Sequence, residues 1–168
     1  MITVTDQTKQ IADGVEARVV HDVVSEGGQQ VEVTDDWYAQ DSAGNVWYFG
    51  EDTAEYENGK LKTRSGSFEA GVDGADAGIA MPAQPEVGQT YRQEYYAGQA
   101  EDRTAVLSLE EQAQSPFGHF NVVLLTKDYT PIEPDVLEYK LYAKGVGQVL
   151  AVTVSGGSER EELVSYTK

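Results

Sequence analysis

Hydrophobic and polar residues alternate with a period of two along much of the chain. Val15, Ala17 and Val19 occupy alternate positions, and so do Val31 and Val33. Successive side chains of a β-strand point to opposite faces of its sheet, so this alternation predicts strands with one buried face. The strands expected on this basis span residues 2–5, 15–25, 30–41, 45–51, 53–57, 60–64, 90–97, 102–109, 119–130, 136–143, 146–155 and 159–167.

Turn signals separate these segments closely enough for hairpins. Asn58-Gly59 and Gly156-Gly157 each lie between two strand-like runs, and both residue types accept the positive φ angles of tight turns. The one helix signal, a capping-box spacing over residues 108–111, is followed too soon by Pro116, and we interpret it as a strand end or a short turn. The pattern therefore predicts an all-β protein: a curled antiparallel meander, a half-barrel or a partly open β-barrel, whose curling protects sheet edges.

A single β domain is predicted over residues 1–168, because this length is ordinary for one domain and no repeat or linker interrupts it. Residues 66–90 are rich in Gly, Ala and Pro, and they predict a long loop. Loops of this length in a compact domain often form or cover a binding site. The alternative is an ordered crossover between two halves of the sheet.

The charge of the chain restricts its partners. It has 29 acidic and 12 basic residues, which give a formal net charge of −17. Nucleic acids and anionic membrane surfaces bind Lys and Arg, so we expect neither as a partner. The simplest role of the acidic surface is to keep the protein in solution. No run approaches the roughly 20 apolar residues of a membrane-spanning helix, and the first residues show no signal-peptide pattern. We therefore expect no membrane insertion.

Familiar catalytic and metal-binding motifs are missing from the sequence. It has no cysteine, and its two histidines, His21 and His119, lack the spacing of a zinc site. There is neither a nucleophile elbow nor a phosphate-binding loop. Acidic pairs such as Glu51-Asp52 follow aromatic runs, but none has the spacing of a calcium loop. Catalytic residues and metal ligands are therefore left unassigned, and no cofactor is expected.

Aromatic residues gather on three of the expected strands. Trp47 and Tyr48 are consecutive, so they must point to opposite faces, and simple alternation places Glu51 on the face of Trp47. Either both faces are covered, or one of them lines a cavity. A cavity lined by aromatic rings and a few polar groups is a common small-molecule site. The alternative is that the aromatic residues only build the core.

Charged residues accompany the aromatic residues of segment 90–97, where alternation places Arg92, Glu94 and Tyr96 on one face. In the cavity hypothesis, the aromatic side chains pack against the ligand, and Arg92 and Glu94 orient its polar groups. The residues assigned to this ligand site are Trp37, Trp47, Tyr48, Arg92, Glu94 and Tyr96.

Several longer strings resemble a family of bacterial β proteins that has no assigned activity and includes many secreted or lipid-anchored members. The strings are DWYAQD (36–41), GNVWYFGEDT (44–53), SFEAGVDG (67–74), YRQEYY (91–96) and YAKGVG (142–147). The last is also similar to curled-sheet proteins related to lipoprotein carriers. The resemblance spans nearly the whole chain and implies an extracytoplasmic protein, periplasmic or secreted. Family members carry a further N-terminal segment before the strand near Ile2. Either the sequence was trimmed at this point, or a sheet edge that is normally covered is open here and accepts a partner's strand.

Three hypotheses for function follow. The leading one is a non-catalytic extracytoplasmic binding module with an aromatic-lined cavity for a small or apolar ligand. The second is a β-barrel enzyme that positions its substrate, or that uses Glu51 or Glu94 beside a tyrosine for acid–base chemistry. The third is a structural or interaction protein that is stabilised by calcium or accepts a strand from a protein partner. We favour a non-enzymatic function.

Overall fold

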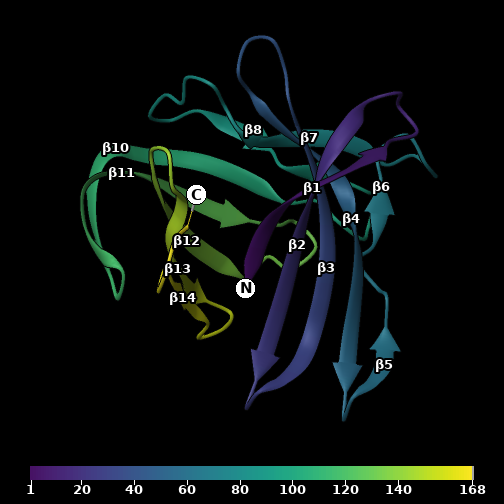
Figure 1. The fold of residues 1–168 in the computed structure, drawn as a ribbon. Coiled ribbons are helices and arrows are strands. Elements are labelled where there is room, and N and C mark those ends of the chain that lie inside the picture. Colours follow the sequence, from purple (N-terminus) through teal and green to yellow (C-terminus); the bar gives the residue numbers. More distant parts are fainter. Residues whose placement is uncertain (168) are drawn as a thin grey trace. The chain divides into compact units, whose positions relative to one another are not determined.

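The computed structural model describes residues 1–167, which contain fourteen strands and no helix (Figure 1). The all-β prediction is confirmed. In the described residues the strands form two antiparallel sheets that are not closed into a barrel, consistent with a curled meander or an open half-barrel. With no helix present, none is long and apolar enough to cross a membrane in this part of the chain.

The chain divides into two compact units, which are described separately. The first unit contains residues 1–83 and 93–101, and the second contains residues 84–92 and the chain from Asp102 onward. The prediction of one domain over residues 1–168 stays a prediction.

The first unit contains a sheet with the order β1-β2-β3-β4-β7-β9, and β5 and β6 also pair with β4. The two segments expected at 45–51 and 53–57 form one continuous strand, β4. The strands are β1 (Ile2–Gln10), β2 (Glu16–Glu26), β3 (Gln29–Gln40), β4 (Val46–Glu57), β5 (Lys60–Thr63), β6 (Phe68–Glu69), β7 (Asp76–Met81) and β9 (Glu94–Tyr95).

The segment 66–90 is not loop throughout, because it contains β6 and β7. β7 pairs with β4 through Trp47 with Ile79 and Tyr48 with Gly78. Glycine and alanine have low intrinsic preference for strands, so their local sequence predicts a loop. The backbone of β4 provides the hydrogen-bond partners that hold this segment extended.

The second unit contains a sheet with the order β14-β13-β12-β11-β10-β8. Figure 1 shows β10 and β11 as strongly curved ribbons. Register shifts interrupt their pairing between Val106 and Ala113, as expected where bulges bend a hairpin. The strands are β8 (Thr90–Arg92), β10 (Arg103–Ser115), β11 (Gly118–Tyr129), β12 (Leu137–Ala143), β13 (Gly147–Ser155) and β14 (Arg160–Glu162).

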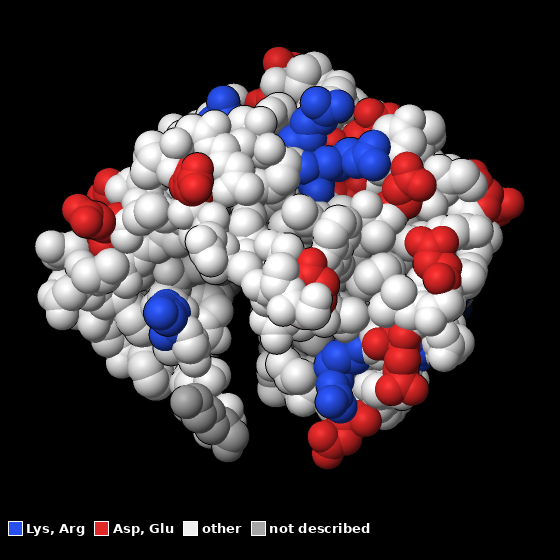
Figure 2. Space-filling view, turned by 90° about the horizontal axis from the view of Figure 1, so that it is seen from above, with Lys and Arg blue, Asp and Glu red and all other residues white. Residues whose placement is uncertain are grey.

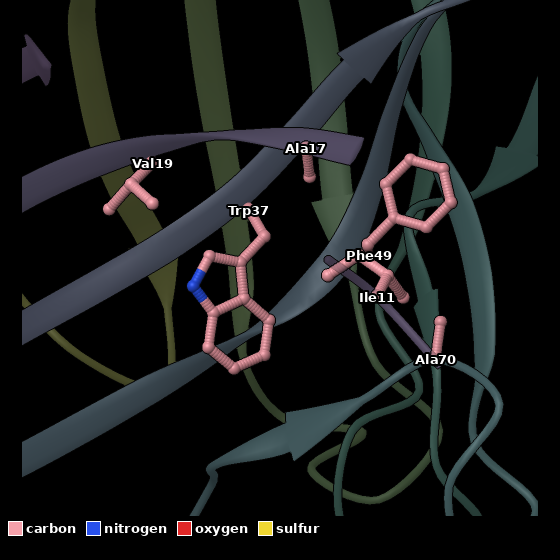
Figure 3. Packing of buried hydrophobic residues seen from close by; sticks show 6 residues of the cluster. All are labelled: Ile11, Ala17, Val19, Trp37, Phe49 and Ala70. Carbon is pink, nitrogen blue, oxygen red and sulfur yellow. The ribbon is translucent and has the colours of Figure 1, made fainter. Parts of the chain in front are cut away.

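Both faces of the first sheet are covered by apolar side chains. Trp37 and Tyr38 are consecutive on β3, and they belong to two different clusters of buried residues. Figure 3 shows the Trp37 indole within the first cluster. The core of this cluster consists of Ile11, Ala17, Val19, Trp37, Phe49 and Ala70. The second cluster contains Tyr48, Phe68, Ala75 and Ala100, with Tyr38, Ala80 and Tyr96 packed against it.

Candidate functional site

A β-bulge at Gly50 determines which side chains meet on β4. β3 and β4 pair Asp36 with Glu51 and Tyr38 with Tyr48. Between these two pairs β3 has one residue and β4 has two, so β4 contains one extra residue. Gly50 has a φ of +111°, a conformation that favours glycine. The extra residue reverses the alternation, and the expectation that Glu51 shares the face of Trp47 is therefore wrong. Glu51 lies on the face of Tyr48 and contacts it.

The hydroxyl of Tyr48 lies between two carboxyl groups. Its oxygen is 2.8 Å from Oδ1 of Asp36 and 3.0 Å from Oε2 of Glu51. A phenol has one proton, so it donates to only one carboxylate at a time. The second contact is a hydrogen bond only when that carboxyl group carries a proton of its own. The arrangement therefore favours one proton shared by Asp36 and Glu51 across Tyr48.

Electrostatics assign this extra proton to Asp36. Burial raises the pKa of Asp36 from 3.8 to about 6; the hydrogen bond from Tyr48 opposes the rise, and the nearby carboxylates of Asp22, Asp35 and Glu32 add to it. Burial, with the charges of Glu51 and Asp36, also raises the pKa of Tyr48 well above its ordinary value. Tyr48 therefore remains a neutral donor at neutral pH. A carboxyl group that titrates near pH 6 beside aromatic rings is typical of functional sites.

Four aromatic rings, one of them that of Tyr48, form a row at this carboxyl pair. The centroids of Tyr38 and Tyr48 are 5.0 Å apart, those of Tyr48 and Phe68 are 5.9 Å apart, and those of Phe68 and Tyr96 are 6.5 Å apart. Tyr48 and Phe68 are buried, whereas Tyr38 and Tyr96 are partly buried at the two ends of the row. We call this group the aromatic–carboxylate site, and it consists of Asp36, Tyr38, Tyr48, Glu51, Phe68 and Tyr96.

Of the ligand set predicted from the sequence, Tyr48 and Tyr96 belong to this site, and Glu51, named in the acid–base alternative, lies beside Tyr48. Trp37 lies on the opposite face of the sheet, where its side chain is buried in the core and Nζ of Lys9 is 4.3 Å from its ring centroid. Lys9 also forms an ion pair of 2.9 Å with Glu69. These contacts give Trp37 the packing role that the core alternative predicted for the aromatic residues.

Trp47 stabilises the turn between β3 and β4. Its indole Nε1–H donates to Oδ2 of Asp41 at 2.9 Å, and Oδ1 of Asp41 accepts hydrogen bonds from the backbone N–H groups of Ala43 and Asn45. Hydrogen bonds from Trp47 and Asn45 lower the pKa of Asp41 to about 2. The string from Asp41 to Trp47 therefore has a local role in closing this hairpin.

The chain separates Arg92 from Glu94. The strand expected over 90–97 is divided, so that Arg92 ends β8 in the second unit and Glu94 begins β9 in the first. Arg92 pairs with Arg103, whereas Glu94 pairs with Ala77. The structure thus brings together Tyr48 and Tyr96 of the predicted set, places Trp37 and Trp47 on the other face, and assigns Arg92 and Glu94 to different sheets.

Sequence reasoning missed Asp36, Tyr38 and Phe68. Asp36 and Tyr38 are two positions apart on β3, which places them on one face, and this spacing was a usable signal. A glycine inside an apolar strand, such as Gly50, is also a recognised sign of a bulge. The position of Phe68 had no local signal, because its strand has two residues and exists through pairing with β4.

The described residues 1–167 contain no group of three or more His, Asp or Glu side chains arranged to hold a metal ion. The carboxylates around Asp36 interact with it electrostatically without converging on one point.

Replacing Asp36 with asparagine is expected to change how stability depends on pH. Asp36 is protonated in the folded and unfolded states below about pH 4, and above pH 6 the folded state must hold a buried charge. The contribution of Asp36 to stability is thus full below about pH 4 and is lost as the pH rises through 6. An asparagine at this position still accepts the Tyr48 hydrogen bond without this charge. Urea unfolding at pH 8 should show D36N about 2 kcal/mol more stable than the parent, with little difference at pH 4.

The matched control for this prediction is Asp6→Asn, because Asp6 is exposed. D6N should leave the stability profile nearly unchanged at both pH values. A D36N variant that is less stable than the parent at pH 8 would show that Asp36 is charged and favourably paired in the folded protein.

The resemblance to secreted and lipid-anchored bacterial β proteins stays a prediction. What the site does is accordingly inferred from its own residues. No protein-family model, curated protein or solved structure matches this chain.

Proposed function

We propose that the protein is a non-catalytic extracytoplasmic binding module whose first unit binds a small, partly apolar ligand at the aromatic–carboxylate site. The observation that carries this proposal is the Tyr48 hydroxyl held between Asp36 and Glu51, with the Tyr48 ring forming part of a row of four aromatic rings. Apolar surface with a few convergent polar groups is the usual composition of a small-molecule site. The extracytoplasmic location is proposed from the sequence resemblance.

The charges of the site favour a ligand that carries an amine. Asp36 is surrounded by the carboxylates of Asp22, Asp35 and Glu32, which raise its pKa. A cation placed beside these groups offsets their mutual repulsion. Aromatic ring faces also attract cations, with a strength of about 0.5–2 kcal/mol for each contact. A ligand with an apolar body and an ammonium group therefore matches both halves of the site.

The proposal is tested with Tyr96→Ala and phenethylammonium as the probe. Tyr96 is partly buried at the end of the ring row, so its truncation removes ligand contact more than core packing. Binding measured by NMR titration should weaken roughly ten-fold in Y96A. Native mass spectrometry of the purified protein should in addition show a small-molecule adduct that Y96A loses.

Tyr95→Ala is the matched control, because Tyr95 is the adjacent tyrosine and lies outside the ring row. It should leave the affinity for phenethylammonium near the parent value. If Y96A lowers the free energy of unfolding as much as it lowers the free energy of binding, Tyr96 is a core residue and the proposal fails.

An enzyme that uses acid–base catalysis is the second candidate, and the pKa of Asp36 near 6 favours it. A group that titrates near the working pH is suited to proton transfer, and Tyr48 connects it to the second carboxyl group, Glu51. Asp36→Asn separates the two candidates, since in a binding module it should only weaken the affinity for phenethylammonium by removing one carboxylate from the site. An enzyme of this kind loses turnover although its fold is at least as stable.

A further inference from the structure

Three basic side chains lie on one face of the second sheet. Arg103 of β10 pairs with Arg92 of β8 on one side and with Tyr129 of β11 on the other. Directly opposed residues of antiparallel strands point to the same face. Lys127 is two positions before Tyr129 on β11, so it shares this face, and its Nζ is 5.2 Å from the centroid of the Tyr129 ring.

A hollow of about 260 Å³ lies at these residues, and it is lined by Thr90, Tyr91, Arg92, Arg103 and Tyr129. We call it the Arg–Tyr hollow. All five residues belong to the second unit. Its volume is below the roughly 300–1,000 Å³ of sites for drug-sized ligands, so it suits a ligand of only a few heavy atoms.

The positive charge of the hollow contrasts with the rest of the chain. The protein has a net charge of −17, and Figure 2 shows carboxylates dispersed over the visible face with basic side chains in small groups. The second unit has six Lys and Arg residues in its described part, and three of them are Arg92, Arg103 and Lys127. Arg92 and Arg103 are directly opposed on paired strands, which places two guanidinium-bearing residues at one point of the sheet.

We propose that the Arg–Tyr hollow binds a small phosphate-type oxyanion, either inorganic phosphate or a phosphate monoester. The planar guanidinium group of Arg103 is exposed and presents paired N–H donors that match the geometry of phosphate oxygens. Lys127 adds a cation on the same face, and the Tyr129 ring offers an apolar surface for the organic part of a monoester. This site is independent of the aromatic–carboxylate site, and neither proposal depends on the other.

The test is an NMR titration of the ¹⁵N-labelled protein with inorganic phosphate at constant ionic strength. Amide signals of β8, β10 and β11 should shift and saturate. Arg103→Gln should weaken the apparent affinity roughly ten-fold or more, because a hydrogen bond to a charged group contributes about 1.5–3 kcal/mol. Phenyl phosphate distinguishes the two ligands: tighter binding than phosphate identifies a monoester site, and equal binding identifies a site for free phosphate.

Lys60→Gln is the matched control, since it removes one exposed positive charge from the first unit. K60Q should bind phosphate as the parent does. Shifts that grow linearly without saturating, or equal weakening in R103Q and K60Q, would mean that phosphate only screens surface charge, and the proposal would be overturned. Because Arg103 is exposed, R103Q is expected to fold, and its dispersed spectrum checks this directly.

Discussion

Gly50→Ala is expected to destabilise the first unit by roughly 3–5 kcal/mol. A β carbon on residue 50 would lie 2.1 Å from the carbonyl oxygen of Phe68, which is backbone and has no side-chain freedom with which to move away. Residue 50 also has a φ of +111°, where side chains other than hydrogen are strained. Both effects act on the bulge that places Glu51 beside Tyr48. Urea unfolding followed by tryptophan fluorescence measures the loss, since Trp37 and Trp47 lie in this unit.

Gly59→Ala separates the two causes. Gly59 also has a positive φ, +71°, but a β carbon there would meet nothing within 4 Å. G59A should therefore show the conformational penalty alone, about 1–2 kcal/mol. Equal losses in G50A and G59A would mean that β6 moves away from residue 50 at little cost, and that the bulge does not depend on glycine for space.

The strands of this protein were predictable because their alternation is local. The Asn58-Gly59 signal also held, since both residues have positive φ angles at the turn between β4 and β5. Simple alternation failed where a strand gains a residue. The bulge at Gly50 moves every later residue of β4 to the opposite face of the sheet. The identity of Glu51 gives no indication of this change of face. The contact between Glu51 and Tyr48 therefore had to come from the structure.

The division of segment 90–97 had a different cause. Residues 90–92 pair with β10, and residues 94–95 pair with β7, so the change of sheet at Gln93 depends on distant partners. The alternation of apolar and polar residues does not indicate which neighbouring strand the two halves of segment 90–97 will pair with. Arg92 and Glu94 were expected on one face because segment 90–97 was expected to form one continuous strand. Their assignment to a single ligand site depended on that continuous strand.

The second unit shows a further limit of patterning, because polar positions of its strands are buried. Thr104 and Thr126 are fully buried, and Asp128 is 7% exposed. Alternation predicts that such residues face water. They are instead stabilised by hydrogen bonds across the strands, including one from Oγ1 of Thr104 to Oδ1 of Asp128 at 3.0 Å. This hydrogen-bonded group also contains a lysine, and its energetic role is open to a direct test.

Lys140→Met is expected to reduce the free energy of unfolding by about 3 kcal/mol, the lower end of the range for breaking a buried ion pair, because Asp128 is buried whereas Lys140 is only partly buried. Nζ of Lys140 is 3.4 Å from Oδ2 of Asp128 and 3.1 Å from Oε2 of Glu138. Burial alone would lower the pKa of Lys140, but its interactions with Tyr142, Asp128 and Glu138 outweigh burial and raise the pKa above its ordinary value; at neutral pH the two carboxylates are the charged partners. Lys140 is therefore charged at neutral pH. Methionine keeps much of its apolar side chain and removes the cation between the two carboxylates.

Lys62→Met is the matched control, because Lys62 forms an ion pair of similar length, 3.0 Å, with Glu55 in an exposed position. Water screens exposed ion pairs, so K62M should leave the free energy of unfolding nearly unchanged. In the double variant K140M/D128N one carboxylate charge is also removed, and part of the lost stability should return. Equal losses in K140M and K62M, measured by urea unfolding at pH 7, would mean that water screens Lys140 as it screens the surface pair. The larger loss expected for K140M follows from burial, since the two pairs differ little in length and greatly in exposure.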